Sequence, residues 1–358
     1  MEKNFKGKRF VRITAGVVFI LLAMVCIYYL PTVIGNSNTY DEAAAQKLSA
    51  YTDSLFAASE NKLAAGKEVK GEIINQKAFE RYQKALETLK STSKDKPRGK
   101  DETLIGNLKY KEGDFNLKLF MVSYDPEYLD KSIRIFNEVQ KQIKPEENTS
   151  IYRLLHFSLG NAYLFQKAEN QKEKLNRVVN AYSEALKYSD NKTPSDQKGL
   201  TLYNLGYAYG FLSGKDDIKS KNKAIEYFME SLKIFNAAMY PGRYKDTHNR
   251  MGIVYFQLSR IEDREENLLK SAESFQESIR FHDTETLTDN YALNLNLLGL
   301  TYETLAAIKE RGANLKKALD AYIKALDVYR NITDPEYKYT YLIKHLPERI
   351  EIIEKELR

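Results

Sequence analysis

Apolar residues recur every three or four positions along most of the chain, a spacing that predicts amphipathic helices. Four stretches share one frame, in which a large apolar residue precedes a glycine and a tyrosine follows three positions later. The frame reads Leu159-Gly160-Asn161-Ala162-Tyr163 and returns at 205–209, 251–255 and 298–302. Its glycines are 46, 46 and 47 residues apart. A fixed period of this length predicts an array of structural repeats.

Each frame is followed by a second motif, in which an aromatic residue precedes a small one by three positions. The pairs are Tyr182 and Ala185, Phe228 and Ser231, Phe275 and Ser278, and Tyr322 and Ala325. Three-residue spacing places both side chains on one helical face, so each unit is predicted to be a pair of helices. A glycine within a helix costs about 1 kcal/mol relative to alanine. We therefore expect the frame glycines at a close contact between the two helices, with the small residue of the second motif opposite.

These two motifs together resemble the tetratricopeptide repeat family over about residues 150–330. The units here, at 46–47 residues, are longer than the family's usual length of about 34. The resemblance implies an all-α fold, a TPR-like α-solenoid of antiparallel helix pairs. Four repeats are expected within 150–332, followed by C-terminal capping helices at 336–358 that are interrupted at Pro347.

Two further units that diverge from the frame are predicted within 41–144. The first covers about 41–90, and its second helix carries Ala78, Tyr82, Ala85 and Leu86. The second covers about 102–144, where Leu129, Ser132, Phe136 and Val139 match the spacing of the later second helices. Within it, Gly113-Asp114-Phe115 is expected to be a turn.

The N-terminal region has the pattern of a membrane anchor. Residues 13–40 contain no charged side chain, and 13–34 are mostly apolar; a helix of that length spans about 33 Å, enough for a bilayer. The basic tail at 1–12 carries five Lys and Arg residues, which favours a cytoplasmic N-terminus with the repeats outside. The alternative is a signal peptide cleaved after Gly35, although such peptides have an apolar region of only about 7–15 residues. We expect a single-pass protein of a bacterial inner membrane with periplasmic repeats.

The composition and the absence of known motifs exclude several classes of function. The net charge is +6, but residues 1–12 contribute +4 of it, so no basic face for nucleic acid is indicated. The single cysteine excludes an intramolecular disulfide and a cysteine-based metal site. The four histidines are scattered without metal-ligand spacing, and no phosphate-binding or nucleophile motif is present. We therefore expect no enzyme, no cofactor, no metal and no small-molecule substrate.

The first helices of successive units line the concave wall of a solenoid, so partner proteins or peptides are expected to bind there. The predicted groove residues are Phe157, Asn161, Tyr203, Tyr207, Asn249, Ile253, Asn296 and Leu300. The alternative is that these side chains pack between units.

Some members of the resembled family bind a partner's C-terminal carboxylate with a clamp of lysine, asparagine and arginine side chains. Asn161, Asn204 and Arg250 occupy positions that match the clamp, but its lysine positions hold Phe157 and Asp246. Without those lysines the negative charge of a carboxylate is poorly compensated. The interpretation is therefore a membrane-anchored scaffold that organises an envelope complex, such as a flagellar-collar-type assembly. The alternative is a periplasmic chaperone-like binder of exported chains near the translocon.

Overall fold

The computed structural model describes residues 100–167, 169–190, 196–214, 217–281, 289–331 and 340–358. The basic tail, the apolar segment 13–34 and the divergent unit at 41–90 lie outside these residues. No helix within the described ranges is both long and apolar enough to cross a membrane. The described residues form two compact units: unit 1 contains 100–167 and 180–190, and unit 2 contains 169–179 and the described residues from 196 onward.

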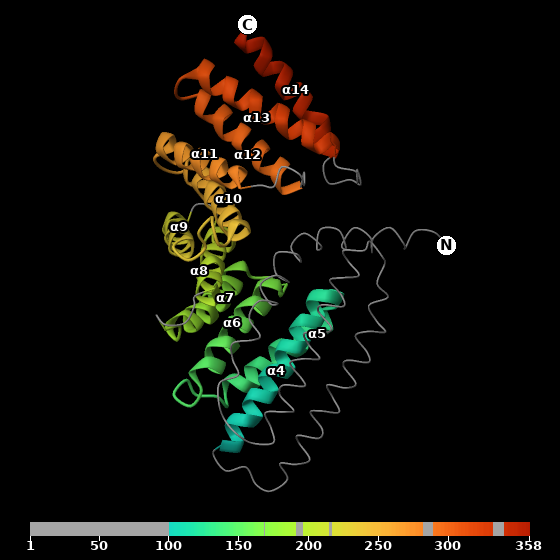
Figure 1. The fold of residues 1–358 in the computed structure, drawn as a ribbon, viewed down its shortest axis with the longest axis vertical. Helices are drawn as coiled ribbons and strands as arrows, with labels where there is room; N and C mark the ends of the chain where they lie inside the picture. The colour runs from blue at the N-terminus through green and yellow to red at the C-terminus, as the bar shows by residue number, and fades with distance from the viewer. Residues whose placement is uncertain (1–99, 168, 191–195, 215–216, 282–288, 332–339) are drawn as a thin grey trace, which may run out of the picture. The chain divides into compact units, whose positions relative to one another are not determined.

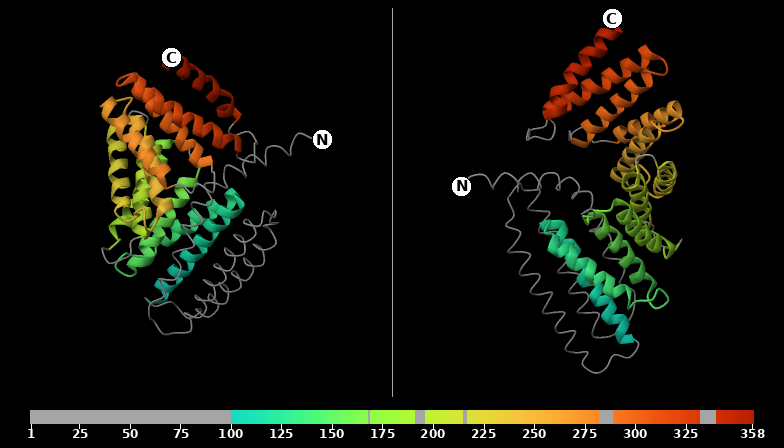
Figure 2. Two further views of the ribbon diagram at one scale, coloured as in Figure 1. Left: turned by 45° about the horizontal axis from the view of Figure 1, so that its top comes forward. Right: turned by 180° about the vertical axis from the view of Figure 1, so that it is seen from behind.

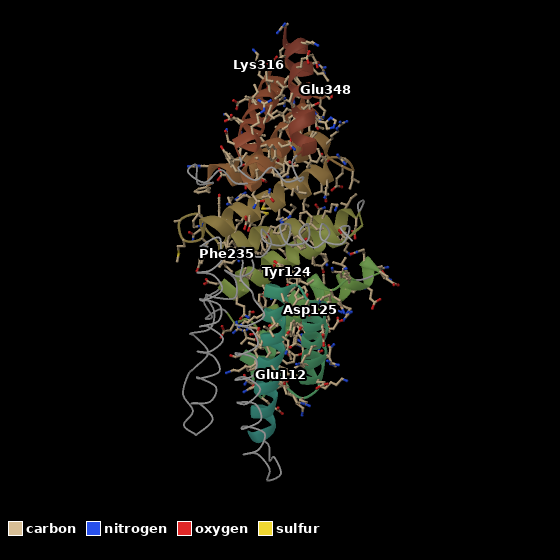
Figure 3. All side chains as sticks on the ribbon, turned by 90° about the vertical axis from the view of Figure 1, so that its right-hand side faces the viewer. Glu112, Tyr124, Asp125, Phe235, Lys316 and Glu348 are labelled. Carbon is tan, nitrogen blue, oxygen red and sulfur yellow. The ribbon has the colours of Figure 1, made fainter. Side chains whose placement is uncertain are left out.

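Unit 1 contains α4 (Lys100–Ser123), α5 (Pro126–Gln140), α6 (Thr149–Phe165) and the second half of α7 (Gln171–Lys187). The turn between α4 and α5 forms at Tyr124, whose φ of 56° lies in the left-handed region. Asp125, labelled beside it in Figure 3, accepts a hydrogen bond from the backbone N–H of Glu127 at 3.0 Å. This N-cap, with Pro126 in the first turn, fixes the start of α5.

The expected turn at Gly113-Asp114-Phe115 is wrong, because these residues lie within α4. Gly113 is buried there, and a Cβ added to it would lie 2.5 Å from the ring of Phe136 on α5. The glycine therefore allows two helices to approach closely instead of breaking one of them.

Unit 2 contains eight helical segments in addition to the start of α7. They are α8 (Asp196–Tyr207), η1 (Ala208–Leu212), α9 (Ile218–Leu232), α10 (Pro241–Leu258), α11 (Arg264–Arg280), α12 (Asp289–Ala306), α13 (Arg311–Asn331) and α14 (Thr340–Leu357). From α8 onward each helix packs against the next (Figures 1 and 2). The described residues contain helices and no strand. The predicted architecture of stacked helix pairs is thus confirmed.

The frame glycines lie at the contact between the two helices of each unit, as expected. A Cβ added to Gly160, Gly206, Gly252 or Gly299 would approach a ring atom to 2.5, 2.7, 2.9 or 2.6 Å, respectively. The residue opposite is the aromatic one of the second motif, not the small one, so that part of the expectation is wrong. The rings concerned belong to Tyr182, Phe228, Phe275 and Tyr322. A flat ring fills the space left by a missing side chain more completely than a methyl group does.

The small residues of the second motif are also fully buried, at 0% exposure for Ala185, Ser231 and Ala325. Ser231 Oγ donates to the carbonyl oxygen of Gly199 on α8 at 3.0 Å. Phe235, labelled in Figure 3, is 2% exposed and would lie 2.8 Å from a Cβ added to Gly199. Ser231 and Gly199 thus mark a second close contact between α8 and the segment that contains α9.

The C-terminal helix α14 continues through Pro347, so the expected break there is wrong. A proline within a helix removes one backbone hydrogen bond. Leu346 and Ile353, only 3% and 2% exposed, are buried in the same core cluster as residues of α12 and α13. This burial holds the helix together across the proline. Its outer side chains, including Glu348 (labelled in Figure 3), Glu351 and Lys355, are exposed.

Candidate protein-binding surface

The eight predicted groove residues fall into two groups that differ in solvent exposure. Tyr203, Tyr207, Asn249, Ile253, Asn296 and Leu300, all on α8, α10 and α12 of unit 2, are partly exposed. Phe157 and Asn161, on α6 of unit 1, are each 8% exposed. Only the six residues in unit 2 therefore offer side-chain surface to a partner.

In unit 1 the two groove candidates take part in helix packing. The ring of Phe157 lies 5.9 Å from that of Tyr182, centroid to centroid. Asn161 Oδ1 accepts a hydrogen bond from the Tyr182 hydroxyl at 2.6 Å. Both contacts join α6 to α7 within unit 1, which is the packing interpretation left open above.

In unit 2, four side chains form what we call the aromatic–arginine surface: Tyr203, Tyr207, Phe211 and Arg250. The rings of Tyr207 and Phe211 are stacked with centroids 5.0 Å apart and planes at 22°. The guanidinium carbon of Arg250 lies 5.3 Å from each of these two centroids. Arg250 also forms a side-chain hydrogen bond with Tyr203, and all four side chains are partly exposed. An arginine held against aromatic faces is worth about 0.5–2 kcal/mol, so the surface is ordered before any partner arrives.

Charges around this surface are uneven. Burial raises the pKa of the Asp246 carboxyl, and the positive charges of Lys245, Arg243 and Arg250 oppose this shift. Its Oδ2 is enclosed and has no hydrogen-bond partner. Burial acts to lower the pKa of the Arg250 guanidinium, but Tyr203, Tyr207 and Asp246 together outweigh that effect and raise it. Arg250 is therefore cationic, and positive charge predominates at this end of α10.

Further along the first helices, polar side chains join one unit to the next. Asn249 Nδ2 on α10 donates to Asn294 Oδ1 on α12. Asn294 Nδ2 in turn donates to Ser278 Oγ on α11 at 2.9 Å. Ile253 packs against the core cluster formed by α11 to α14. Asn249 and Ile253 thus contribute to packing as well as to the exposed surface.

The clamp positions do not form a site for a free carboxylate. Asn161 is buried and bonded to Tyr182 in unit 1, and Asn204 is only 7% exposed. Arg250 lies against Tyr207 and Phe211. Phe157 and Asp246 bring no cation to the lysine positions.

Sequence reasoning missed Phe211 and the segment that carries it. Residues 208–212 form a π-helix at the end of α8, whereas α10 and α12 continue as α-helix at the matching positions. The available signal was Gly210, four residues after the frame glycine Gly206. A second glycine within a helical pattern lowers the expectation of a regular helix.

The histidines His156 and His248 lie in two similar clusters that the sequence pattern did not reveal. In each, a tyrosine four residues earlier lies 4.4 Å from the imidazole, centroid to centroid. The hydroxyl of that tyrosine donates a hydrogen bond to a glutamate on the second helix. The distance is 3.3 Å from Tyr152 to Glu184 and 3.1 Å from Tyr244 to Glu277. Burial lowers the pKa of both histidines, and the glutamates oppose the shift. Neutral imidazoles packed against rings are structural elements of their helix pairs.

Among the described residues, no group of three His, Cys, Asp or Glu side chains is placed to hold a metal ion. The polar groups described above contribute to packing or to the aromatic–arginine surface.

No family model and no curated protein matches this chain. Among solved structures, it is similar to a signal-transduction ATPase (STAND) protein with a tetratricopeptide repeat sensor from Pyrococcus horikoshii. The identity is 17% and the TM-score 0.41, over 79% of this chain and 42% of that one. A chain of the DHF58 filament matches with 14% identity and a TM-score of 0.15, over 72% of this chain and 96% of that one. This chain thus spans less than half the length of the STAND protein, and neither likeness bears on function.

Proposed function

We propose that this protein is a scaffold that binds other proteins through the first helices of its repeats. The observation that carries the proposal is the aromatic–arginine surface, where Tyr203, Tyr207 and Phe211 remain partly exposed beside Arg250. Aromatic and arginine side chains dominate the energetics of protein interfaces. Ordered rings also lose little conformational entropy on binding.

The proposed setting is a bacterial inner membrane. Residues 13–34 anchor the chain, the tail at 1–12 is cytoplasmic, and the repeats are periplasmic, as the charge and hydropathy of the N-terminal sequence favour. The scaffold then organises an envelope complex, of which a flagellar-collar-type assembly is one example. The second candidate is a chaperone-like binder of exported chains, which the partly exposed aromatic rings would equally suit.

Cross-linking in native membranes, followed by affinity capture, tests the proposal and separates its two forms. A scaffold captures one partner in a fixed ratio, whereas a chaperone-like protein captures many chains weakly. Tyr203→Ala combined with Tyr207→Ala is expected to weaken capture at least tenfold, a loss of about 1.4 kcal/mol. Glu230→Lys, at an exposed position on α9, is the control and should leave capture unchanged.

Loss of folding would confound the double variant, because the Tyr203 ring also lies 5.7 Å from the buried ring of Phe228. Tyr207→Ala alone leaves that contact in place. Circular dichroism should show the same helix content for each variant as for the original chain. If both tyrosine variants are folded and capture is unchanged, the partner binds elsewhere and the proposed surface is wrong.

A further inference from the structure

One buried lysine sets the helix pair of α8 and α9 apart from the other described pairs. Seven residues before the second-helix aromatic, four of the five helix pairs that the structure describes carry leucine: Leu129, Leu175, Leu268 and Leu315. The fifth described pair, α8 with α9, carries Lys221 at this position. Lys221 is 2% exposed, as buried as the leucines Leu129, Leu268 and Leu315, which are 4%, 0% and 4% exposed. A buried ammonium is costly unless its hydrogen bonds are satisfied, so the substitution needs a reason.

The partner of Lys221 lies in the π-helix η1. Lys221 Nζ donates to the carbonyl oxygen of Gly210 at 3.2 Å. Carbonyl groups at a helix C-terminus have no partner within the helix and carry partial negative charge. The ammonium of Lys221 on α9 therefore caps the end of the first helix, in the helix pair whose first helix ends, among those described, as a π-helix.

Gly210 also differs from the residues at the matching positions of the other described units. Those positions hold Leu117, Leu164, Phe256 and Glu303. A Cβ at Gly210 would lie 2.9 Å from Val254 Cγ2 and 3.4 Å from Ala224 Cβ. The backbone of η1 is thus pressed between α9 and α10, which only glycine permits. It is from this segment that Phe211 reaches Tyr207 and Arg250.

We propose that Lys221 is a positioning residue for the binding surface: it holds η1 in its π-helical form and so keeps Phe211 against Arg250. The inference deepens the proposed function and rests on it. Short π-helical turns occur often at functional sites, and a residue that breaks the rule followed by its equivalents marks such a site. Phe211 is four residues from Tyr207, and side chains at this spacing are neighbours in an α-helix as well. The π-helix instead sets the direction of Phe211 relative to α10, because it has more residues per turn than an α-helix. If η1 relaxed to an α-helix, Phe211 would turn about the helix axis and lose its contact with Arg250.

The test uses Lys221→Met in the full chain, which keeps the length of the side chain and removes its donor. Leu315→Met, at the same register on α13, is the matched control. Two readouts are needed: a crystal structure, for the contact between Phe211 and Arg250, and binding of a probe peptide. The probe is a peptide selected from a random display library on the original chain and shown to lose affinity with Tyr207→Ala.

We expect Lys221→Met to separate Phe211 from Arg250 and to weaken binding of the probe peptide at least tenfold, while Leu315→Met does neither. Gly210→Ala tests the same segment from the other side and should give the same loss. It serves as the decisive variant if Lys221→Met does not fold. An intact Phe211–Arg250 contact in the folded variants, or unchanged peptide affinity despite a lost contact, overturns the role of Lys221. If no selected peptide depends on Tyr207, the proposed function itself fails, and a structural readout alone then decides what Lys221 does to η1.

Discussion

Two glycines on α10 allow the energetic effect of the close helix contact to be measured, because one glycine lies at the contact and the other serves as a control. Gly252 is a frame glycine, and a Cβ there would lie 2.9 Å from both Cδ1 and Cε1 of Phe275. Gly242, ten residues earlier in the first turn of the same helix, has no atom within 4 Å of its added Cβ. The substitution Gly→Ala therefore adds the same methyl group to one helix, once in a tight contact and once in open space.

The expected magnitudes follow from two opposing effects. Alanine is favoured over glycine in a helix by up to about 1 kcal/mol, so Gly242→Ala should stabilise the chain by about 0.5–1 kcal/mol. At Gly252 the same gain is opposed by overpacking, which costs about 1–3 kcal/mol. Carbon atoms favour separations of about 3.5–4.0 Å, so the Phe275 ring would have to retreat by more than half an ångström. Since the propensity terms nearly cancel, the two variants should differ by about 1–3 kcal/mol.

Urea unfolding followed by circular dichroism at equal protein concentration measures this difference. Because repeat arrays do not always unfold in one step, the comparison requires superimposable transition slopes. Phe275→Leu supplies a second check: combined with Gly252→Ala, it should cost less than the two separate changes together, since the smaller side chain relieves the clash. If Gly252→Ala raises the free energy of unfolding as much as Gly242→Ala does, the claim that packing requires the frame glycines is refuted.

The remaining predictions concern pH, the C-terminal helix and the anchor. Burial lowers the pKa of His156 and His248, so below about pH 6.5 the folded chain binds fewer protons than the unfolded one and loses stability as the pH falls. The urea concentration at the midpoint of unfolding should fall as the pH is lowered, and it should fall less in a variant in which both histidines are changed to glutamine. An equal fall in the two proteins contradicts the role of these two groups. Arg349 binds Glu303 through two hydrogen bonds of 2.6 and 3.1 Å, so Arg349→Met should speed amide exchange in α14 and cost up to about 1 kcal/mol. Unchanged exchange would show that apolar packing alone holds α14. The intact mass of protein purified from membranes should include residues 13–34, and a chain that begins near Asn36 would contradict the anchor.

The sequence predicted the helix pairs because their determinants are local and periodic. An aromatic residue that recurs 22 or 23 positions after a glycine, as Tyr182 follows Gly160 and Phe275 follows Gly252, fixes both the element type and its partner. The sequence could not tell whether a ring or a small side chain faces the glycine. That choice depends on how the two helices are rotated about their axes, which sequence spacing does not determine.

Gly113 shows where motif reasoning failed. It lies 47 residues before Gly160 and 23 before Phe136, and its contact with that ring is the same as in the other pairs. Gly113-Asp114-Phe115 suggested a turn because the resembled family often uses one of this kind. Position in the repeat was the better guide, since the packing of α4 on α5 outweighs local turn preference.

The aromatic–arginine surface could be predicted only in part. Tyr203 and Tyr207 were identified from helical register, whereas Phe211 and the stacking of Arg250 depend on η1, which no periodicity encodes. The exposure of the other candidates also depends on tertiary contacts: Phe157 and Asn161 are buried because both contact Tyr182 on α7. A concave-face assignment from register does not show which side chains the second helix covers.

Repetition itself separates structural residues from candidates for function in this chain. A residue that recurs at one register in every unit, like the frame glycine or the aromatic ring against it, is explained by the contact that every unit must make. Lys221 and Gly210 interrupt such registers in one unit, and both interruptions meet at the carbonyl of Gly210. Packing alone does not explain Lys221, because leucine fills its position in the four other described pairs, and Gly210 is what allows η1 to lie close to both α9 and α10. Two departures that converge on the segment carrying Phe211 are most simply explained by what that segment presents to a partner.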